Sequence, residues 1–322
     1  MAMSTAGRPV AAVASPAMPR ARHRPMRRRG GFGDDRPWRW AFFSPALLLM
    51  LALGLLPLVN LLTTSFYDVT WTRAAAVWHG VALAHYAALP ADPLFRAGLV
   101  NNVVFALAAV GGEMLLGFFL ALLCSRIVRG TALYRTIFLL PILTPGIVIG
   151  AIWKLMLNYD FGLVNQMVGL LGLAPQDWLG SPRTALVAVI AVDIWHWTPF
   201  CFLLLLAGIE SLPQDVYEAV HIDGAGFWQE LRYVTLPLLA PAIMVTAAFR
   251  VMVAFKVFDE VYLLTGGGPG TATEVLSYTI YQRFFTENRV GYGAAMSVAV
   301  IFLVSMLLVL SIAARRKAAA EP

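Results

Sequence analysis

Six ionisable side chains lie inside long apolar stretches of this 322-residue sequence: Glu113, Lys154, Asp193, His196, Arg250 and Lys256. In a lipid bilayer a charge at mid-depth costs about 2.5 to 3.5 kcal/mol, so such a group is expected to face a cavity or a partner. Lys154 and Lys256 lie near the ends of their stretches, where a long side chain reaches the headgroups. For Glu113, a structural hydrogen bond and a place on a solute path are equally good explanations. Asp193, His196 and Arg250 remain as candidates, with an Asp193–Arg250 ion pair as a hypothesis.

The segment 193–200 combines these charges with aromatic rings, as Asp-Ile-Trp-His-Trp-Thr-Pro-Phe. Pro199 cannot donate a backbone hydrogen bond, so it loosens a helix at this point. Aromatic faces can stack on the C–H faces of a sugar while nearby polar groups hydrogen bond its hydroxyls. Packing between helices explains Trp195 and Trp197 equally well.

A polar connection at 209–237 carries five acidic residues and a single arginine, Arg232. Pro213 suits the first turn of a helix, and Asp215 complements the positive end of its dipole. Gly224 and Gly226 allow a sharp turn before a second short helix begins at Phe227. The spacing predicts a helix-turn-helix, although a solvated connector would explain the spacing alone.

No short motif of a common catalytic site is present, whether a phosphate-binding loop, a paired-histidine zinc helix or a nucleophile elbow. The glycine-rich stretch 266–270 lacks the lysine of a nucleotide site and predicts a shaped turn. The only cysteines, Cys124 and Cys201, lie in apolar stretches and are expected to pack as small hydrophobic residues. We therefore expect no catalytic residue, metal or cofactor on this chain, and an energy source outside it.

The composition assigns the chain to a membrane. Hydrophobic residues make up 59% and charged residues 13%, whereas a soluble domain is about 25% charged. Stretches of about 20 apolar residues span the hydrocarbon core as helices. We predict an all-α integral membrane protein with an Arg-rich, disordered tail at 1–40, a six-span domain at 41–313 and a short tail at 314–322. The expected spans lie near 41–63, 98–124, 134–157, 184–208, 237–257 and 291–313.

Basic residues set the orientation of such helices, because lysine and arginine accumulate in cytoplasmic segments. Nine arginines precede the first span. If this N-terminal tail lies in the cytoplasm, 16 basic residues lie on the cytoplasmic side and five on the outer side. Both termini and the 209–237 loop are therefore expected in the cytoplasm. A basic tail can also bind nucleic acid, but an orientation signal is the simpler interpretation, so no nucleic-acid partner is expected.

The inside loop resembles a known signature. Glu218-Ala219-Val220 precedes Gly224 by three residues, and nine residues separate Gly224 from Val234-Thr235-Leu236-Pro237. This is similar to the "EAA" loop of permease subunits in binding-protein-dependent ABC importers, which reads Glu-Ala-Ala, three residues, Gly, nine residues, Ile-x-Leu-Pro. Val220 and Val234 depart from it, and both are small and apolar. Segments 135–141, 153–154, 162–165 and 265–269 resemble the carbohydrate-uptake, maltose-type branch.

The resemblance implies a function and its partners. In such importers two permease subunits pair, usually as homologous heterodimers, and an external solute-binding protein delivers the sugar. Two ATPase subunits bind ATP and Mg and receive the inside loops. The chain would thus be a non-enzymatic permease subunit for a sugar or sugar alcohol in a bacterial plasma (inner) membrane. Its ATPase-coupling residues would be Glu218, Ala219, Asp223, Gly224 and Pro237.

The same resemblance implies a solute path, because segment 193–200 contributes to the sugar site in the maltose-type branch. Trp195, Pro199 and Phe200 match that branch in type, whereas Asp193 replaces an amide and Trp197 replaces a glycine. The fifth span of the family faces the cavity at the position of Arg250. The expected pathway residues are Asp193, Trp195, His196, Pro199, Phe200 and Arg250.

Three alternatives stay open. A permease of this family for glycerol phosphate would need a basic cavity, for which Arg250 is the only support. An integral membrane enzyme should show acids or histidines clustered at one interface, and no such cluster is evident. A secondary transporter would need an internal repeat or broken ion-binding helices, and no repeat is visible.

Overall fold

The computed structural model describes residues 36–72, 75–125 and 131–318. The predicted tail up to residue 35, the end of the chain at 319–322, and Arg73, Arg126 and Arg129 of the orientation argument lie outside the described residues. The chain divides into two compact units, residues 1–55 and 56–322. The elements in chain order are α1 Arg36–Thr64, β1 Tyr67–Trp71, β2 Ala76–Gly80, α2 Ala84–Ala88, η1 Leu89–Ala91, α3 Pro93–Ser125, α4 Thr131–Leu143, α5 Gly146–Met156, α6 Leu163–Leu170, α7 Ala185–Glu210, α8 Gln214–Ile222, α9 Phe227–Glu230, the π-helical turn η2 Leu231–Thr235, α10 Leu236–Ala254, α11 Asp259–Leu264, α12 Leu276–Tyr281, the π-helical turn η3 Gln282–Thr286 and α13 Val290–Ala318.

Long apolar helices dominate the described residues. Five are long and apolar enough to cross a bilayer, and the bent pair α4–α5 would make a sixth. They coincide with the predicted spans because hydropathy over about 20 residues is a strong local signal. The fold is therefore that of a mostly helical membrane protein.

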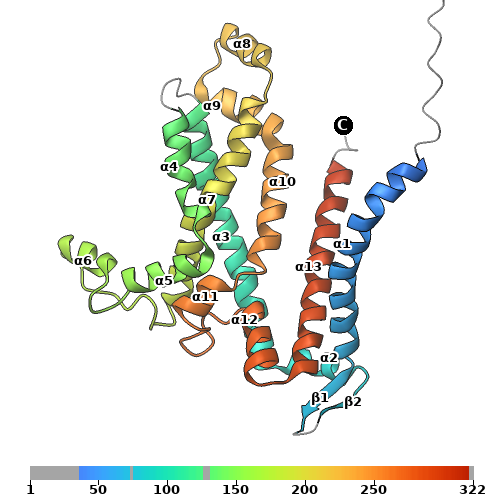
Figure 1. Cartoon of the computed structure of the whole chain (residues 1–322). Coiled ribbons are helices and arrows are strands. Elements are labelled where there is room, and N and C mark those ends of the chain that lie inside the picture. Colours follow the sequence, from blue (N-terminus) through green and yellow to red (C-terminus); the bar gives the residue numbers. More distant parts are fainter. Residues whose placement is uncertain (1–35, 73–74, 126–130, 319–322) are drawn as a thin grey trace, which may run out of the picture. The chain divides into compact units, whose positions relative to one another are not determined.

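The core of the second unit is formed by α3 and α7, which pack along one another, with α10 against both (Figure 1). Close approach is possible because α3 presents small residues. A Cβ on Gly117 would lie 2.8 Å from the Cβ of Cys201 and from the backbone nitrogen of Phe202. Small residues at a helix interface let two membrane helices approach closely, and a larger residue at 117 would force them apart.

The stretch expected as one span at 134–157 is two helices. Helices α4 and α5 meet at an angle of 91°. Pro145 caps α5 with extended backbone (φ −57°, ψ 139°) and lacks the N–H that a continuous helix would need. The proline therefore turns the chain sharply after α4.

The prediction of an all-α protein is wrong for the segment after α1. Strands β1 and β2 form an antiparallel hairpin in which Tyr67 pairs with Gly80 and Trp71 with Ala76. Strand β1 is rich in β-branched and aromatic residues, which favour extended backbone, and β2 adds Val77 and Trp78. The segment had been expected only as a connection between spans.

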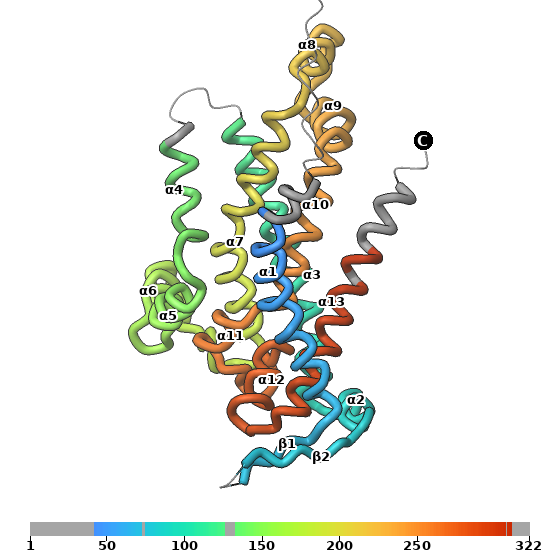
Figure 2. The backbone as a smooth tube through the Cα atoms, turned by 45° about the vertical axis from the view of Figure 1, so that its right-hand side comes forward, coloured from blue at the N-terminus to red at the C-terminus, as the bar shows by residue number. Residues whose placement is uncertain are grey.

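The two remaining connections lie at opposite ends of α7 and α10 (Figure 2). At one end, α8, α9 and η2 connect α7 to α10, and the helix-turn-helix predicted for 209–237 is present. At the other end, α11, α12 and η3 connect α10 to α13. The length of the helices thus separates the acidic loop from the glycine-rich loop.

Candidate functional site

A cluster of buried charges joins the three core helices. The Glu113 carboxylate on α3 accepts hydrogen bonds from Nε and Nη2 of Arg250 on α10, each at 2.5 Å. Nη2 also donates to Asp193 Oδ2 on α7 at 3.0 Å, so the predicted Asp193–Arg250 pair is present. All three side chains are buried. Such a network suits charges in a membrane, since each has an opposite charge within hydrogen-bond distance.

The Arg250 guanidinium is also covered by an aromatic ring. Its central carbon lies 4.3 Å from the ring centroid of Trp197, which is within the range of a cation–π contact. Its Nη1 atom is buried and has no hydrogen-bond partner among the described residues. A hydroxyl or water oxygen in the neighbouring cavity would supply the missing acceptor.

A second buried pair holds α11 against α7. His196 Nδ1 lies 3.0 Å from Glu260 Oε1, and each side chain is only 7% exposed. The adjacent Asp259 is partly buried. Burial, together with the Glu260 carboxylate, raises the pKa of Asp259 above its ordinary value.

Apart from Glu113, these side chains line one cavity of about 400 Å³, within the range of small-ligand sites. Its walls come from α7, α10, the segment that leads into α11, the first residues of α11 and the start of α5. The charged, polar and aromatic side chains of these walls are Asp193, His196, Trp197, Arg250, Lys256, Phe258, Asp259 and Glu260.

The structure separates the predicted pathway residues into two groups. Trp195 and Pro199 line a different, apolar groove of about 720 Å³ between α3, α4 and α7. Phe200 stacks on Phe249 of α10, with ring centroids 4.9 Å apart. Asp193, His196, Trp197 and Phe200 have the i, i+3, i+4, i+7 spacing of one helical face.

Trp197, Glu113 and Glu260 were not among the predicted site residues. Trp197 could have been found from the helical spacing, which places it beside Asp193 and His196. Glu113 had been noted only as an ionisable group in a span. Glu260 lies outside the expected spans, so no local signal connected it with His196.

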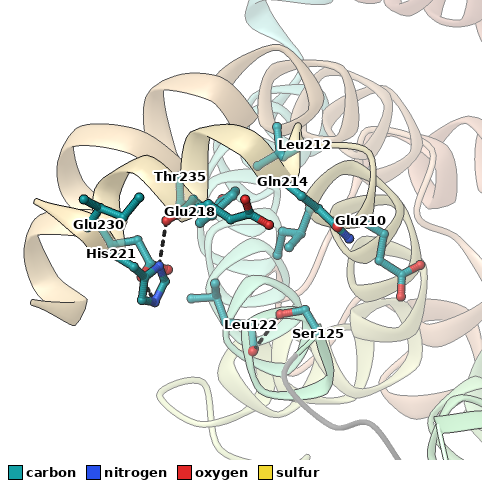
Figure 3. A pocket seen from close by; sticks show the side chains of 12 residues that line it. Leu122, Ser125, Glu210, Leu212, Gln214, Glu218, His221, Glu230 and Thr235 are labelled. Carbon is teal, nitrogen blue, oxygen red and sulfur yellow. Dashed lines mark hydrogen bonds and ion pairs between the residues drawn. The ribbon is translucent and has the colours of Figure 1, made fainter. Parts of the chain in front are cut away.

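The acidic loop forms a projection at one end of α7 (Figure 1), and its side chains line a pocket there (Figure 3). Gly224 has φ +73°, the left-handed conformation that glycine adopts without strain, and it turns the chain between α8 and α9. Tyr217 and Thr235 share a hydrogen bond of 3.1 Å between their hydroxyls, which ties α8 to η2. Glu218 is exposed and lines a hollow of about 1100 Å³ beneath α8.

The other predicted coupling residues lie in the same loop. Ala219 is exposed on α8, Asp223 is its C-cap residue, and Pro237 lies in the first turn of α10. The predicted loop residues are therefore adjacent in space.

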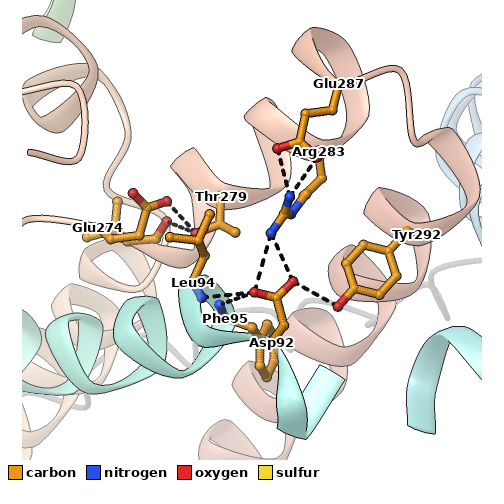
Figure 4. A network of polar contacts seen from close by, with 9 residues as sticks. Asp92, Leu94, Phe95, Glu274, Thr279, Arg283, Glu287 and Tyr292 are labelled. Carbon is orange, nitrogen blue, oxygen red and sulfur yellow. Dashed lines mark hydrogen bonds and ion pairs between the residues drawn. The ribbon is translucent and has the colours of Figure 1, made fainter. Parts of the chain in front are cut away.

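A polar network at the opposite end was not predicted (Figure 4). Asp92 accepts backbone hydrogen bonds from Leu94 and Phe95 at the start of α3, at 2.8 and 3.3 Å. It also accepts hydrogen bonds from Arg283 Nη2 at 3.1 Å and from the Tyr292 hydroxyl at 2.9 Å. Burial alone would raise the pKa of Asp92, but these hydrogen bonds and the arginine charge outweigh it and lower that pKa.

The fold and these sites define a transport permease. Residues 113–317 match the family described as the binding-protein-dependent transport system inner membrane component, and the chain belongs to this family. The resemblance inferred from the 209–237 loop is thereby confirmed. The chain is a multi-pass inner-membrane permease subunit of an ABC importer rather than an enzyme.

Particular relatives are named for sugars. The chain is 36% identical over 261 residues to the trehalose/maltose transport system permease protein of Thermococcus litoralis, covering 81% of this chain and 87% of that protein. It is 34% identical over 272 residues to the sulfoquinovosyl glycerol transport system permease protein of Agrobacterium fabrum, covering 84% and 88%. A crystal structure of a bacterial ABC transporter that imports the acidic polysaccharide alginate shares the fold. It has a TM-score of 0.77 and 22% identity, and it covers 88% of this chain and 96% of that one.

Proposed function

We propose that this chain is one of two permease subunits, paired as a homologous heterodimer, of an ATP-driven importer for an uncharged sugar or sugar alcohol. The observation that carries the proposal is the polar cavity beside the Glu113–Arg250–Asp193 cluster, inside an otherwise apolar helix bundle. An external solute-binding protein delivers the solute. Two ATPase subunits, which bind ATP and Mg, supply the energy.

The proposed topology has six spans, with α4–α5 as the third and both termini in the cytoplasm of a bacterium. Residues 41–313 form the permease domain, with an Arg-rich tail before it and a short tail after it. The position of α8–α9 and α11–α12 at opposite ends of α7 and α10 supports this arrangement, because consecutive loops must alternate between the two sides.

The proposed contact with the ATPase is the tip of the acidic loop. Glu218 faces a basic residue there, Ala219 and Asp223 lie beside it, Gly224 makes the turn, and Pro237 fixes the start of α10. Exposed apolar side chains support a docking role, since Ile222 is 86% exposed and Trp228 is 76% exposed. The acidic loop also complements a basic cleft in charge.

The proposed solute path runs through the cavity at Asp193, His196 and Arg250, with Phe200 on the same face of α7. Trp195 and Pro199 belong to the path as residues that shape α7 from its other face. The cavity residues and Glu113 comprise four carboxylates and two cations, Arg250 and Lys256. Protonation of one carboxylate still leaves no net positive charge. The cavity therefore suits a neutral polyol better than glycerol phosphate.

The test is ATP hydrolysis by the reconstituted complex with its binding protein, measured across maltose, trehalose, glycerol and glycerol phosphate. We expect stimulation by a neutral sugar or polyol and none by glycerol phosphate. Stimulation by glycerol phosphate alone would establish the alternative solute. A complex that no sugar or polyol stimulates would refute the proposal.

A further inference from the structure

Five aromatic rings from α11, the residue before it, α12 and η3 gather in one place: Phe258, Tyr262, Tyr278, Tyr281 and Phe285. Phe258 and Tyr262 are stacked, with centroids 5.3 Å apart and an interplanar angle of 17°. Tyr281 lies 5.3 Å from Phe258 and 5.6 Å from Phe285. These separations are typical of interacting rings, so the five form one continuous cluster.

The cluster connects the buried cavity to the surface. Phe258 lines the cavity that contains Asp193 and Arg250. At the other side of the cluster, Tyr262 is 40% exposed and Phe285 is 70% exposed. An exposed aromatic surface that continues into a polar cavity indicates a binding surface rather than an isolated apolar residue.

The glycine-rich loop holds part of the cluster in place. Gly267 has φ +81°, and a Cβ at this position would lie 2.9 Å from Cε1 of Tyr278, so the ring packs directly on the loop backbone. Ser277 donates a hydrogen bond to the carbonyl of Val257, next to Phe258. The rings are therefore ordered before any ligand arrives, which lowers the entropic cost of binding.

Three of the five rings also carry hydroxyl groups. Side-chain hydrogen bonding to Tyr262 raises the pKa of Tyr281 above its ordinary value, and a phenol with the ordinary value is already neutral at physiological pH. A ring face beside a neutral hydroxyl complements a sugar, which offers C–H faces for stacking and hydroxyls for hydrogen bonding. None of the five side chains carries a charge that would favour an ionic ligand.

We propose that these five residues form a saccharide-stacking platform, an outer subsite at which the sugar stops between the binding protein and the cavity. The proposal rests on the proposed function, since it requires a sugar as the solute. It assigns Tyr262 and Phe285 as the entry side and Phe258 as the link to the cavity.

The experiment replaces the exposed rings, whose removal leaves no hole in the core. Tyr262→Ala and Phe285→Ala are reconstituted in the full complex, with maltose as the probe, or trehalose where maltose is inactive. Sugar uptake is measured against the concentration of sugar-loaded binding protein. We expect the half-saturating concentration to rise about five- to tenfold for each variant, the effect of losing one aromatic contact. The variants Tyr262→Phe and Phe285→Tyr, which keep the rings, should stay near wild type.

Phe161→Ala is the matched control, because Phe161 is 59% exposed in the turn before α6, outside the five-ring cluster, the cavity and the acidic loop. If both alanine variants keep the wild-type half-saturating concentration, the platform proposal is wrong. The proposed function as a sugar importer is unaffected by that result. If the variants weaken binding of the sugar-free binding protein as much as that of the sugar-loaded form, the rings belong to a protein-docking surface. Loss of co-purification with the second permease would assign them to a subunit interface. Either result overturns the proposal. A wild-type complex that transports no sugar would refute the proposed function itself.

Discussion

Glu113 and Arg250 form a buried two-hydrogen-bond ion pair across 137 residues of sequence, and Asp193 adds a third hydrogen bond to the same guanidinium. The three residues belong to α3, α10 and α7. One arginine therefore fixes the relative position of the three helices that form the core. Because the three side chains are buried, the consequences of removing one partner are large.

We predict that Glu113→Gln destabilises the purified complex by about 3–5 kcal/mol, the usual cost of leaving a buried charge without its partner. The measurement is the thermal unfolding midpoint at a fixed scan rate. Glu210→Gln serves as the control, since the Arg135–Glu210 pair is half exposed, and removing such a pair costs at most about 1 kcal/mol. A midpoint for Glu113→Gln as close to wild type as that of Glu210→Gln would contradict the prediction.

The long apolar helices and the acidic loop could be predicted from sequence because their signals are local. Hydropathy identifies a span within about 20 residues. Gly224 marks a turn and Pro237 marks the start of a helix, and neither signal depends on residues distant in sequence. The glycine at 224 has the positive φ that its place in the predicted turn requires.

The cavity could not be predicted in the same way, because its contacts are distant in sequence. Nothing near Glu113 indicates that its partner is Arg250. The 91° bend at Pro145 was also missed, since hydropathy averages over the break. The hairpin after α1 is too short to stand out beside the apolar spans.

The helical positions of Trp195 and Trp197 decide which face of α7 each ring lies on. Two positions along a helix rotate a side chain by about 200°, so the two rings point to opposite faces. We predict that Trp197→Ala impairs uptake more than Trp195→Ala, because only Trp197 contacts the cavity and Arg250. Loss of this cation–π contact should raise the half-saturating concentration about five- to tenfold.

Both tryptophan variants are compared in the assembled complex, with co-purification of the second permease as the check on folding. Trp153 lies against Trp195, with centroids 5.5 Å apart, so Trp153→Phe tests whether disturbance of that side of α7 alone lowers uptake. A larger loss for Trp195→Ala than for Trp197→Ala would move the solute path to the apolar groove.

The Asp92 network predicts a pH dependence of stability. The pKa of Asp92 is lower in the folded protein than in the unfolded chain, so the unfolded state binds the proton more readily. The stabilisation is thus present above the unfolded value of about 4 and is lost as the pH falls through the folded value. We predict that Asp92→Asn lowers the unfolding midpoint at pH 7, by the equivalent of about 1–2 kcal/mol, and has a smaller effect at pH 3.5.

Asp177→Asn is the control for this prediction. Asp177 also accepts a backbone hydrogen bond, from Gly180 at 2.8 Å. Unlike Asp92, which contacts Arg283, it forms no ion pair with an arginine in the part of the chain that the structure describes. Its replacement should change the midpoint by a similar small amount at both pH values. An effect of Asp92→Asn that is independent of pH would show that the charge of Asp92 does not stabilise the fold.

The coupling loop makes the last prediction. Glu218 is exposed on α8 and faces no cation within its own chain among the described residues, so its charge is available to a partner. Glu218→Lys should leave the complex assembled but reduce solute uptake at least about tenfold, because juxtaposed like charges cost several kcal/mol. The measurement is uptake into membrane vesicles that contain all subunits. Asp160→Lys, an equal charge change at an exposed position before α6, should leave uptake unchanged. Normal uptake by Glu218→Lys would remove Glu218 from the contact with the ATPase.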